Sequence, residues 1–248
     1  MGPPRAAGRW SLVADLVGEG RGPTERAHAA ALALLQRHGV VTREAVLGEG
    51  LAGGFAAVYP VLRAMEEAGR IRRGYFVEGL GGAQFALPGA VDRLRAEREQ
   101  SPAELPPALL LAAADPAQPY GAILPWPRRD EAERLPLQRA AGAYVVLVGG
   151  EAALYVERGA RGLITLPAAD DVAVQEAGLA ALPRLLLPAG PLQELRLERV
   201  NRVPPAESTL AERLRAMGFR PTYRSWLLRP AEPSGHKETS RRNVASTP

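Results

Sequence analysis

The first hundred residues hold three stretches in which apolar side chains recur at helical spacing. Residues 23–38 predict a helix, because proline and glutamate suit a first helical turn and Gly39 suits the position after the last one. Thr42 is expected to cap a second, short helix. A third helix is predicted over residues 54–68, and its inward-facing side chains at helical spacing are Phe55, Val58, Leu62 and Met65.

The segment after the third helix has the pattern of a β-hairpin. Residues 71–77 and 83–87 predict two strands, and the glycine-rich residues 78–82 predict the turn between them. Three helices followed by a hairpin is the element order of a winged helix, in which the third helix reads nucleic acid and the hairpin is the wing. Residues 90–99 predict a connecting helix, and the proline-rich residues 100–107 predict a domain boundary.

The second half of the chain alternates short apolar runs with glycine turns, which is typical of β-rich domains. Helices are predicted over residues 170–186, where Pro183 would kink or stop the helix, and over residues 208–217, where Ser208 would be the N-cap. The charged residues 128–138 predict a mobile loop. Strands are predicted over residues 108–113, 143–148, 152–157, 163–166, 192–200 and 219–229.

These elements predict the α+β fold class in two domains. We expect a winged-helix domain with its connecting helix in residues 1–100 and a β-rich, barrel-like α+β domain in residues 101–230. The polar residues 231–248 predict a disordered tail.

Composition narrows the function classes without selecting one. The 248 residues include no cysteine, which excludes disulfides, thiolate metal sites and thiol catalysis and fits a reducing cytoplasm. No apolar run has the roughly 18 residues that a membrane span needs, so no membrane partner is expected. Lys237 is the only lysine beside 30 arginines. Guanidinium groups suit phosphate, but high arginine content also fits a GC-rich genome, so the charge permits nucleic acid without requiring it.

The strongest candidate for a binding surface is the predicted wing. Arg70, Arg72, Arg73 and Tyr75 lie on or beside its first strand, and Arg63 lies on the third helix. If the wing flanks the third helix, these side chains reach the phosphate backbone and position the protein without reading sequence. The alternative is that the winged helix packs against another protein domain and that the basic wing pairs with acidic neighbours.

The search for catalytic motifs leaves only carboxylates. There is no GxxxxGK[ST] loop, and the three histidines are isolated from one another, so neither a cofactor nor a metal site is predicted. Asp115 is the candidate catalytic residue because it lies in a rigid turn beside Pro116 and Tyr120. The alternative is structural, because Asp-Pro is a common way to open a turn. Asp170 and Asp171, which precede a predicted helix, are further carboxylates of this kind, and the alternative for them is that one is the N-cap of that helix.

Several segments resemble the C-terminal region of bacterial large helicase-related (Lhr) proteins. They are residues 38–95, from HGVVTREAVL to AVDRLR, followed in the same order by DPAQPYGAILPWP, AGAYVVLVGGEAALYVERG and LAERLRAMGFRPTYRSWLLR. The resemblance implies a module from a DNA repair helicase. It also implies similarity to AlkZ-type DNA glycosylases, which have tandem winged helices followed by a β-barrel.

Two departures limit what the resemblance implies. The ATPase motor is missing from this chain, and so is the pair of glutamines, flanking one apolar residue, that AlkZ-type enzymes use. We therefore expect a DNA-binding module for single- or double-stranded DNA, with a helicase motor domain or a separate motor chain as partner. Two alternatives stay open. One is a DNA glycosylase that excises uracil or a damaged base with a carboxylate such as Asp115, and the other is a scaffold that forms homo-oligomers.

Overall fold

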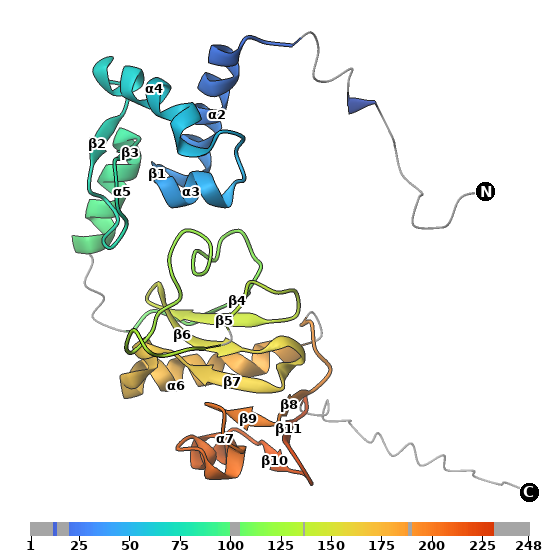
Figure 1. Cartoon of the computed structure of the whole chain (residues 1–248). Helices are drawn as coiled ribbons and strands as arrows, with labels where there is room; N and C mark the ends of the chain where they lie inside the picture. Colours follow the sequence, from blue (N-terminus) through green and yellow to red (C-terminus); the bar gives the residue numbers. More distant parts are fainter. Residues whose placement is uncertain (1–11, 14–19, 100–104, 136, 188–189, 231–248) are drawn as a thin grey trace, which may run out of the picture. The chain divides into compact units, whose positions relative to one another are not determined.

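The computed structural model describes residues 12–13, 20–99, 105–135, 137–187 and 190–230 (Figure 1). The predicted disordered tail and part of the predicted domain boundary lie outside these residues. The chain divides into two compact units, Met1–Ser101 with Ala122–Leu124, and Pro102–Gly121 with Pro125–Pro248. Among the described residues, no helix combines the length and the apolar character that crossing a bilayer requires.

The first unit has the order of elements that the sequence predicts for a winged helix. Thr42 caps α3 as expected, because its Oγ1 accepts a hydrogen bond from the backbone N–H of Ala45 at 3.1 Å. One element was missed, the two-residue strand β1. The elements are α2 (Pro23–His38), β1 (Val40–Val41), α3 (Arg43–Gly48), α4 (Gly54–Glu67), β2 (Arg72–Gly74), β3 (Gln84–Ala86) and α5 (Pro88–Glu99).

The three strands of this unit form an antiparallel sheet in the order β1-β3-β2. The central strand β3 is buried along its whole length, and Phe85 pairs with Val41 on one side and Arg73 on the other. Phe85 is fully buried, and its ring lies 6.5 Å from that of Phe55 and 6.0 Å from that of Tyr59. This aromatic packing fixes the wing strands against α4.

The second unit is built on a five-stranded sheet in the order β4-β5-β6-β7-β9. Neighbouring strands are antiparallel except for β7 and β9, which are parallel. The helix α6 (Val172–Ala181) packs on β5 and β6, and Gly178 brings its backbone close to Leu154. The strands are β4 (Leu109–Ala112), β5 (Tyr144–Val148), β6 (Glu151–Val156), β7 (Gly162–Thr165) and β9 (Arg199–Val200).

A smaller antiparallel sheet has the order β10-β11-β8. It consists of β10 (Arg220–Pro221), β11 (Trp226–Leu228) and β8 (Leu195–Leu197), with α7 (Ala211–Ala216) before β10. The α+β class and the winged helix are confirmed. Among the described strands, the two sheets stay open, with β4 and β9 as edges of the larger one, so the barrel-like domain is instead a pair of open sheets.

Four details of the second unit differ from the predictions. The strand predicted over residues 192–200 is two short strands, β8 and β9, which belong to different sheets. The strand predicted over residues 219–229 is a hairpin, because Thr222 bonds back to Ser225 and turns the chain. Ser208 does not cap a helix, because α7 begins at Ala211 after Leu210. The predicted helix over residues 170–186 is α only to Ala181 and then continues as a 3₁₀ helix, Leu182–Leu186, which agrees with Pro183 stopping it.

Candidate functional site

The wing presents its basic side chains to solvent. Arg70, Arg72 and Arg73 are exposed, and Tyr75 is 90% exposed. Between them Ile71 is only 2% exposed and anchors the start of the ribbon in the apolar core. The sequence-predicted wing residues therefore share one accessible ribbon.

Two of the predicted cations are held by carboxylates of α4. Arg63 Nε lies 2.9 Å from Glu67 Oε1, and Arg73 Nε lies 3.4 Å from Glu66 Oε1. Among the described residues, Arg70 and Arg72 form no ion pair. These two guanidinium groups are the most available for a polyanion.

The side chain of Gln84, which is fully buried, forms hydrogen bonds with the backbone of the wing turn. Its Oε1 accepts hydrogen bonds from the backbone N–H groups of Phe76 at 2.8 Å and Val77 at 2.9 Å. Its Nε2 donates to the carbonyls of Val77 and Leu80, both at 3.0 Å. The side-chain amide therefore replaces the β-ladder where β2 ends. A lone glutamine carries no sequence signal for this role, so sequence reasoning missed it.

The outward face of α4 has few groups that can read a base. Its exposed positions are Ala56, Ala57, Pro60, Arg63, Ala64 and Glu67. Arg63 is the only cation among them, and Glu67 holds it. Base-specific readout needs donors and acceptors that reach base edges, and this face is mostly alanine and proline.

Asp115 lies in the second unit and opens a turn. Its Oδ1 accepts a hydrogen bond from the backbone N–H of Ala117 at 2.8 Å, and its carbonyl accepts from Arg139 Nη2 at 3.0 Å. Its carboxylate is not part of the cavity described next.

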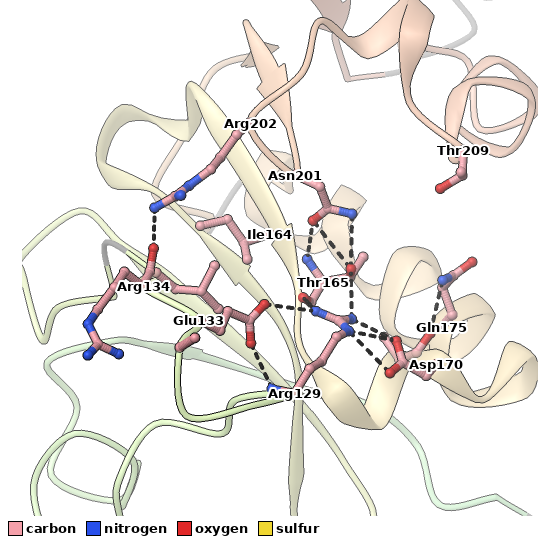
Figure 2. A pocket seen from close by; sticks show the side chains of 13 residues that line it. Arg129, Glu133, Arg134, Ile164, Thr165, Asp170, Gln175, Asn201, Arg202 and Thr209 are labelled. Carbon is pink, nitrogen blue, oxygen red and sulfur yellow. Dashed lines mark hydrogen bonds and ion pairs between the residues drawn. The ribbon is translucent and has the colours of Figure 1, made fainter.

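A polar cavity of about 800 Å³ lies beside the end of β7 (Figure 2). At its centre, Arg129 Nη2 donates to Asp170 Oδ1 at 2.7 Å, and Arg129 Nη1 donates to the carbonyl of Thr165 at 3.1 Å. Glu133 lies on the other side of the guanidinium, with Oε1 3.4 Å from Arg129 Nη1. These bonds tie the loop that the sequence predicts to be mobile to the strand β7 and to Asp170.

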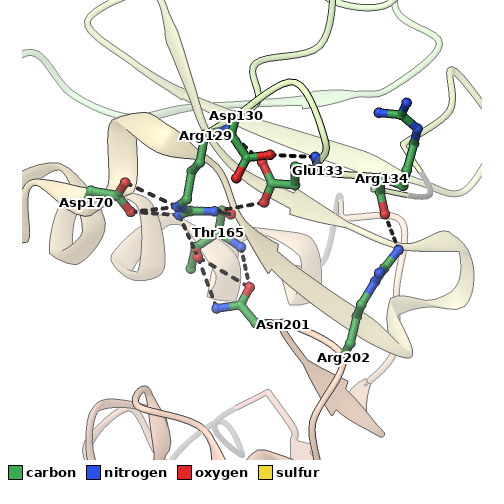
Figure 3. Close-up of polar contacts among 8 residues, drawn as sticks. All are labelled: Arg129, Asp130, Glu133, Arg134, Thr165, Asp170, Asn201 and Arg202. Atoms are coloured by element: carbon green, nitrogen blue, oxygen red, sulfur yellow. Dashed lines mark hydrogen bonds and ion pairs between the residues drawn. The ribbon is translucent and has the colours of Figure 1, made fainter.

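The hydrogen bonds to Asp170 are the main reason that the pKa of Arg129 is raised, and burial opposes them. The guanidinium therefore stays charged at every physiological pH. Figure 3 shows Arg129 between Asp170 and Glu133, with Thr165 linking it to Asn201.

The cavity was missed by sequence reasoning because its polar residues come from separate segments. Arg129 and Glu133 lie before β5, Thr165 and Asp170 follow β6, and Asn201 follows β9. Pairing of β7 with β9 brings Asn201 to Thr165, and the hydrogen bonds of Arg129 to Thr165 and Asp170 hold the loop before β5 at the same place. No short spacing in the sequence records that proximity. Among the described residues, no three His, Asp or Glu side chains cluster as metal ligands do.

Comparison with known proteins places the first unit in a family. Residues 20–106 match the family described as large helicase-related protein, winged-helix domain. This part of the chain belongs to the Lhr family. The Lhr match covers every element of the winged helix, from α2 to α5, and therefore includes the wing with its arginines and Gln84.

Two Lhr relatives extend the similarity into the second unit. The chain is 48% identical over 202 residues to a Mycolicibacterium smegmatis protein named Lhr helicase/probable uracil glycosylase, which covers 81% of this chain. It is 39% identical over 219 residues to an Escherichia coli protein named Lhr helicase/uracil glycosylase, which covers 87% of this chain. The chain spans only 13% and 14% of the lengths of these two curated relatives.

Proposed function

We propose that the Lhr winged helix binds the phosphate backbone of DNA, single- or double-stranded, through its wing. The observation that carries the proposal is the exposure of Arg70, Arg72, Arg73 and Tyr75 on one ribbon whose turn Gln84 holds in place. Arginine on a rigid ribbon suits planar contacts to phosphate oxygens. Tyr75 adds an exposed ring on which a base can stack.

The same geometry favours binding that does not depend on the DNA sequence. The outward face of α4 offers mainly alanine and proline, and its single cation is paired with Glu67. Phosphate contacts position a protein on DNA, whereas base contacts specify a site. We therefore expect affinities for unrelated sequences of equal length to agree within a few-fold.

The test measures affinity by fluorescence anisotropy across a salt series with labelled single- and double-stranded oligonucleotides. The double variant Arg70→Gln, Arg72→Gln, which removes the two wing cations without an ion pair among the described residues, should bind more weakly. Its slope of log K against log salt should be shallower by about two units, since each lost phosphate contact removes about 0.7–0.9. The matched control is Arg128→Gln, Arg134→Gln, because these two arginines are exposed, lie in the second unit and form no ion pair among the described residues. An unchanged slope in the double variant would remove the wing from the interface.

We further propose that the chain is part of the C-terminal region of an Lhr-type DNA repair helicase and acts in the cytoplasm. The two relatives are far longer than this chain and are named helicases, which supports this placement. A motor domain on the same polypeptide or on a separate chain would then be the partner that hydrolyses ATP.

A second candidate function is excision of uracil from DNA. It is favoured by the names of both relatives, which include uracil glycosylase and which align with most of this chain. Purified protein incubated with uracil-containing single-stranded DNA should then give strand breaks after alkali. Loss of the breaks in Asp115→Ala would assign the catalytic role to that carboxylate, and an inactive wild-type chain would exclude excision by this chain alone.

A third candidate function is that of a scaffold, in which the winged helix contacts only a motor or a second copy of the chain. Light scattering combined with the DNA-binding assay separates it from the first proposal. An oligomer that does not bind DNA would support the scaffold, whereas a DNA-binding monomer would exclude it.

A further inference from the structure

The small sheet of the second unit, β10-β11-β8, has one apolar face and one basic face (Figure 1). The apolar face is buried, and its side chains are Leu195, Leu197, Trp226 and Leu228. The residues that alternate with them lie on the opposite face, because successive side chains of a strand point to opposite sides. Pairing across the three strands sets Leu227 between Arg196 on β8 and Arg220 on β10. Both arginines are exposed, so the open face carries a row of arginine, leucine and arginine.

The carboxylates Glu194 and Glu198 beside this face are both held by arginine. Glu194 Oε1 lies 2.7 Å from Arg196 Nη2, and its Oε2 lies 3.7 Å from Arg229 Nε. Glu198, which follows β8, has its Oε1 3.7 Å from Arg161 Nε. Two carboxylates therefore meet three arginines, and the surplus charge is positive before the hairpin β10–β11 is included.

The hairpin adds an aromatic ring and two more cations. Tyr223 is 92% exposed in the turn, and the Arg224 Cζ lies 5.3 Å from the centroid of its ring. A guanidinium over one face of a tyrosine ring makes a cation–π contact, which orients the ring and leaves its other face to solvent. In the part of the chain that the structure describes, Arg220 and Arg224 form no ion pair. The hairpin thus presents an oriented ring and two cations without a counter-charge.

The turn of this hairpin is held in place without the residues that turns favour. The backbone N–H of Thr222 donates to the carbonyl of Ser225 at 2.7 Å, and Thr222 Oγ1 donates to the same carbonyl at 2.6 Å. Glycine, proline, asparagine and aspartate favour the centre of a turn, but Tyr223 and Arg224 occupy it here. At 92% exposure the Tyr223 ring is not part of a core. Neither turn conformation nor packing therefore accounts for an aromatic residue at this position.

We infer that this open face is a second DNA surface, which binds single-stranded DNA with one base stacked on Tyr223 and phosphates at Arg220 and Arg224. An exposed ring can stack on an unpaired base, and guanidinium groups suit phosphate oxygens. A duplex keeps its bases stacked on one another, so the ring selects the single strand. The inference shares the DNA partner of the proposed function but does not depend on the wing, which lies in the other unit.

The experiment uses the full chain with Arg70→Gln, Arg72→Gln, so that the wing contributes less to the affinity. Fluorescence anisotropy measures binding of a short oligothymidylate and of a duplex of equal length. Tyr223→Ala should weaken single-strand binding about fivefold or more, as removal of one stacking ring does, and leave duplex binding unchanged. Tyr223→Phe should bind like its parent, because the ring and not the hydroxyl stacks. Arg220→Gln, Arg224→Gln should make the slope of log K against log salt shallower by about 1.4 units, at about 0.7 for each phosphate contact on a single strand.

Arg128→Gln, Arg134→Gln is the matched control and should leave single-strand affinity unchanged. Melting temperatures should equal that of the parent, because the replaced side chains are exposed. Absence of single-strand binding in the wing-deficient background, or equal binding by Tyr223→Ala and its parent, would overturn the inference. Displacement of the oligothymidylate by polyglutamate at equal charge would also overturn it and would assign the face to an acidic protein. If the wing variant binds DNA as tightly as the wild type, the wing proposal fails, whereas the Tyr223 comparison still tests this surface.

Discussion

The Nε of Arg73 lies 3.4 Å from Oε1 of Glu66, an ion pair that joins the first strand of the wing to the last turn of α4. The Arg73 side chain is 48% exposed and that of Glu66 is 27% exposed. The pair therefore lies at the surface, where its net stabilisation is about 0–1 kcal/mol. Its larger effect is on charge, because Glu66 offsets one of the cations on the proposed DNA surface.

Replacement of Glu66 by glutamine should strengthen DNA binding. The change frees Arg73 for phosphate, so we expect affinity to rise about two- to fivefold at low salt, with a steeper salt dependence. The free energy of unfolding should change by less than about 1 kcal/mol. Glu67→Gln is the matched control, because it makes the same charge change but frees Arg63 on α4. Equal gains in both variants would mean that net charge, not the wing, controls binding.

Replacement of Gln84 by leucine should loosen the wing while the helices stay folded. Leucine has a similar size but leaves two N–H groups and two carbonyls of the turn without their partner, at a cost of about 1–3 kcal/mol. Hydrogen exchange should show loss of protection at the amides of Phe76 and Val77, with the amides of α2 unchanged. DNA affinity should fall in the same variant. Retained protection at both amides would show that Gln84 does not hold the turn.

Glu49 should make the stability of the first unit depend on pH. Its carboxylate accepts from Arg37 Nη1 at 2.5 Å and lies 3.0 Å from His38 Nε2, and the bond from Arg37 is the main cause that lowers its pKa below 4.5. A lowered folded-state pKa stabilises the fold above pH 4.5. That contribution is lost as the pH falls through the folded-state value.

The measurement compares urea unfolding of the wild type and Glu49→Gln between pH 7 and pH 3. The wild type should be more stable at pH 7 by at most about 1 kcal/mol, since the Arg37 side chain is 64% exposed. The difference should shrink toward zero below pH 4.5. A difference that does not vary with pH would contradict the role of this carboxylate.

Much of the first unit could be predicted because its signals are local. The helix bounds follow from Pro23, Gly39, Thr42 and helical periodicity, and the hairpin follows from the glycines between its strands. The strand β1 was missed because two residues are too few to show the alternation of a strand. Only its pairing with Phe85 and Ala86 defines it.

The second unit was predicted less well because long-range pairing decides it. The individual strands β4 to β7 match the apolar runs, but whether they close into a barrel depends on which strands meet at the edges. The polar cavity depends on the same pairing, since Arg129 meets Asp170 across 41 positions of sequence. Of the two candidate sites, only the wing could be predicted from the sequence, because the exposure of its arginines depends on a short hairpin of consecutive residues.

The parallel pairing of β7 with β9 affects how the second unit is completed during synthesis. Gly162 pairs with Arg199. The edge of β7 that faces away from β6 therefore has no neighbouring strand until the ribosome has released the chain beyond Val200. By then the winged helix has long left the exit tunnel, since its last strand ends at Ala86. The nascent chain therefore carries a finished first unit beside an unfinished sheet, and a chaperone that covers bare strand edges would act in that interval.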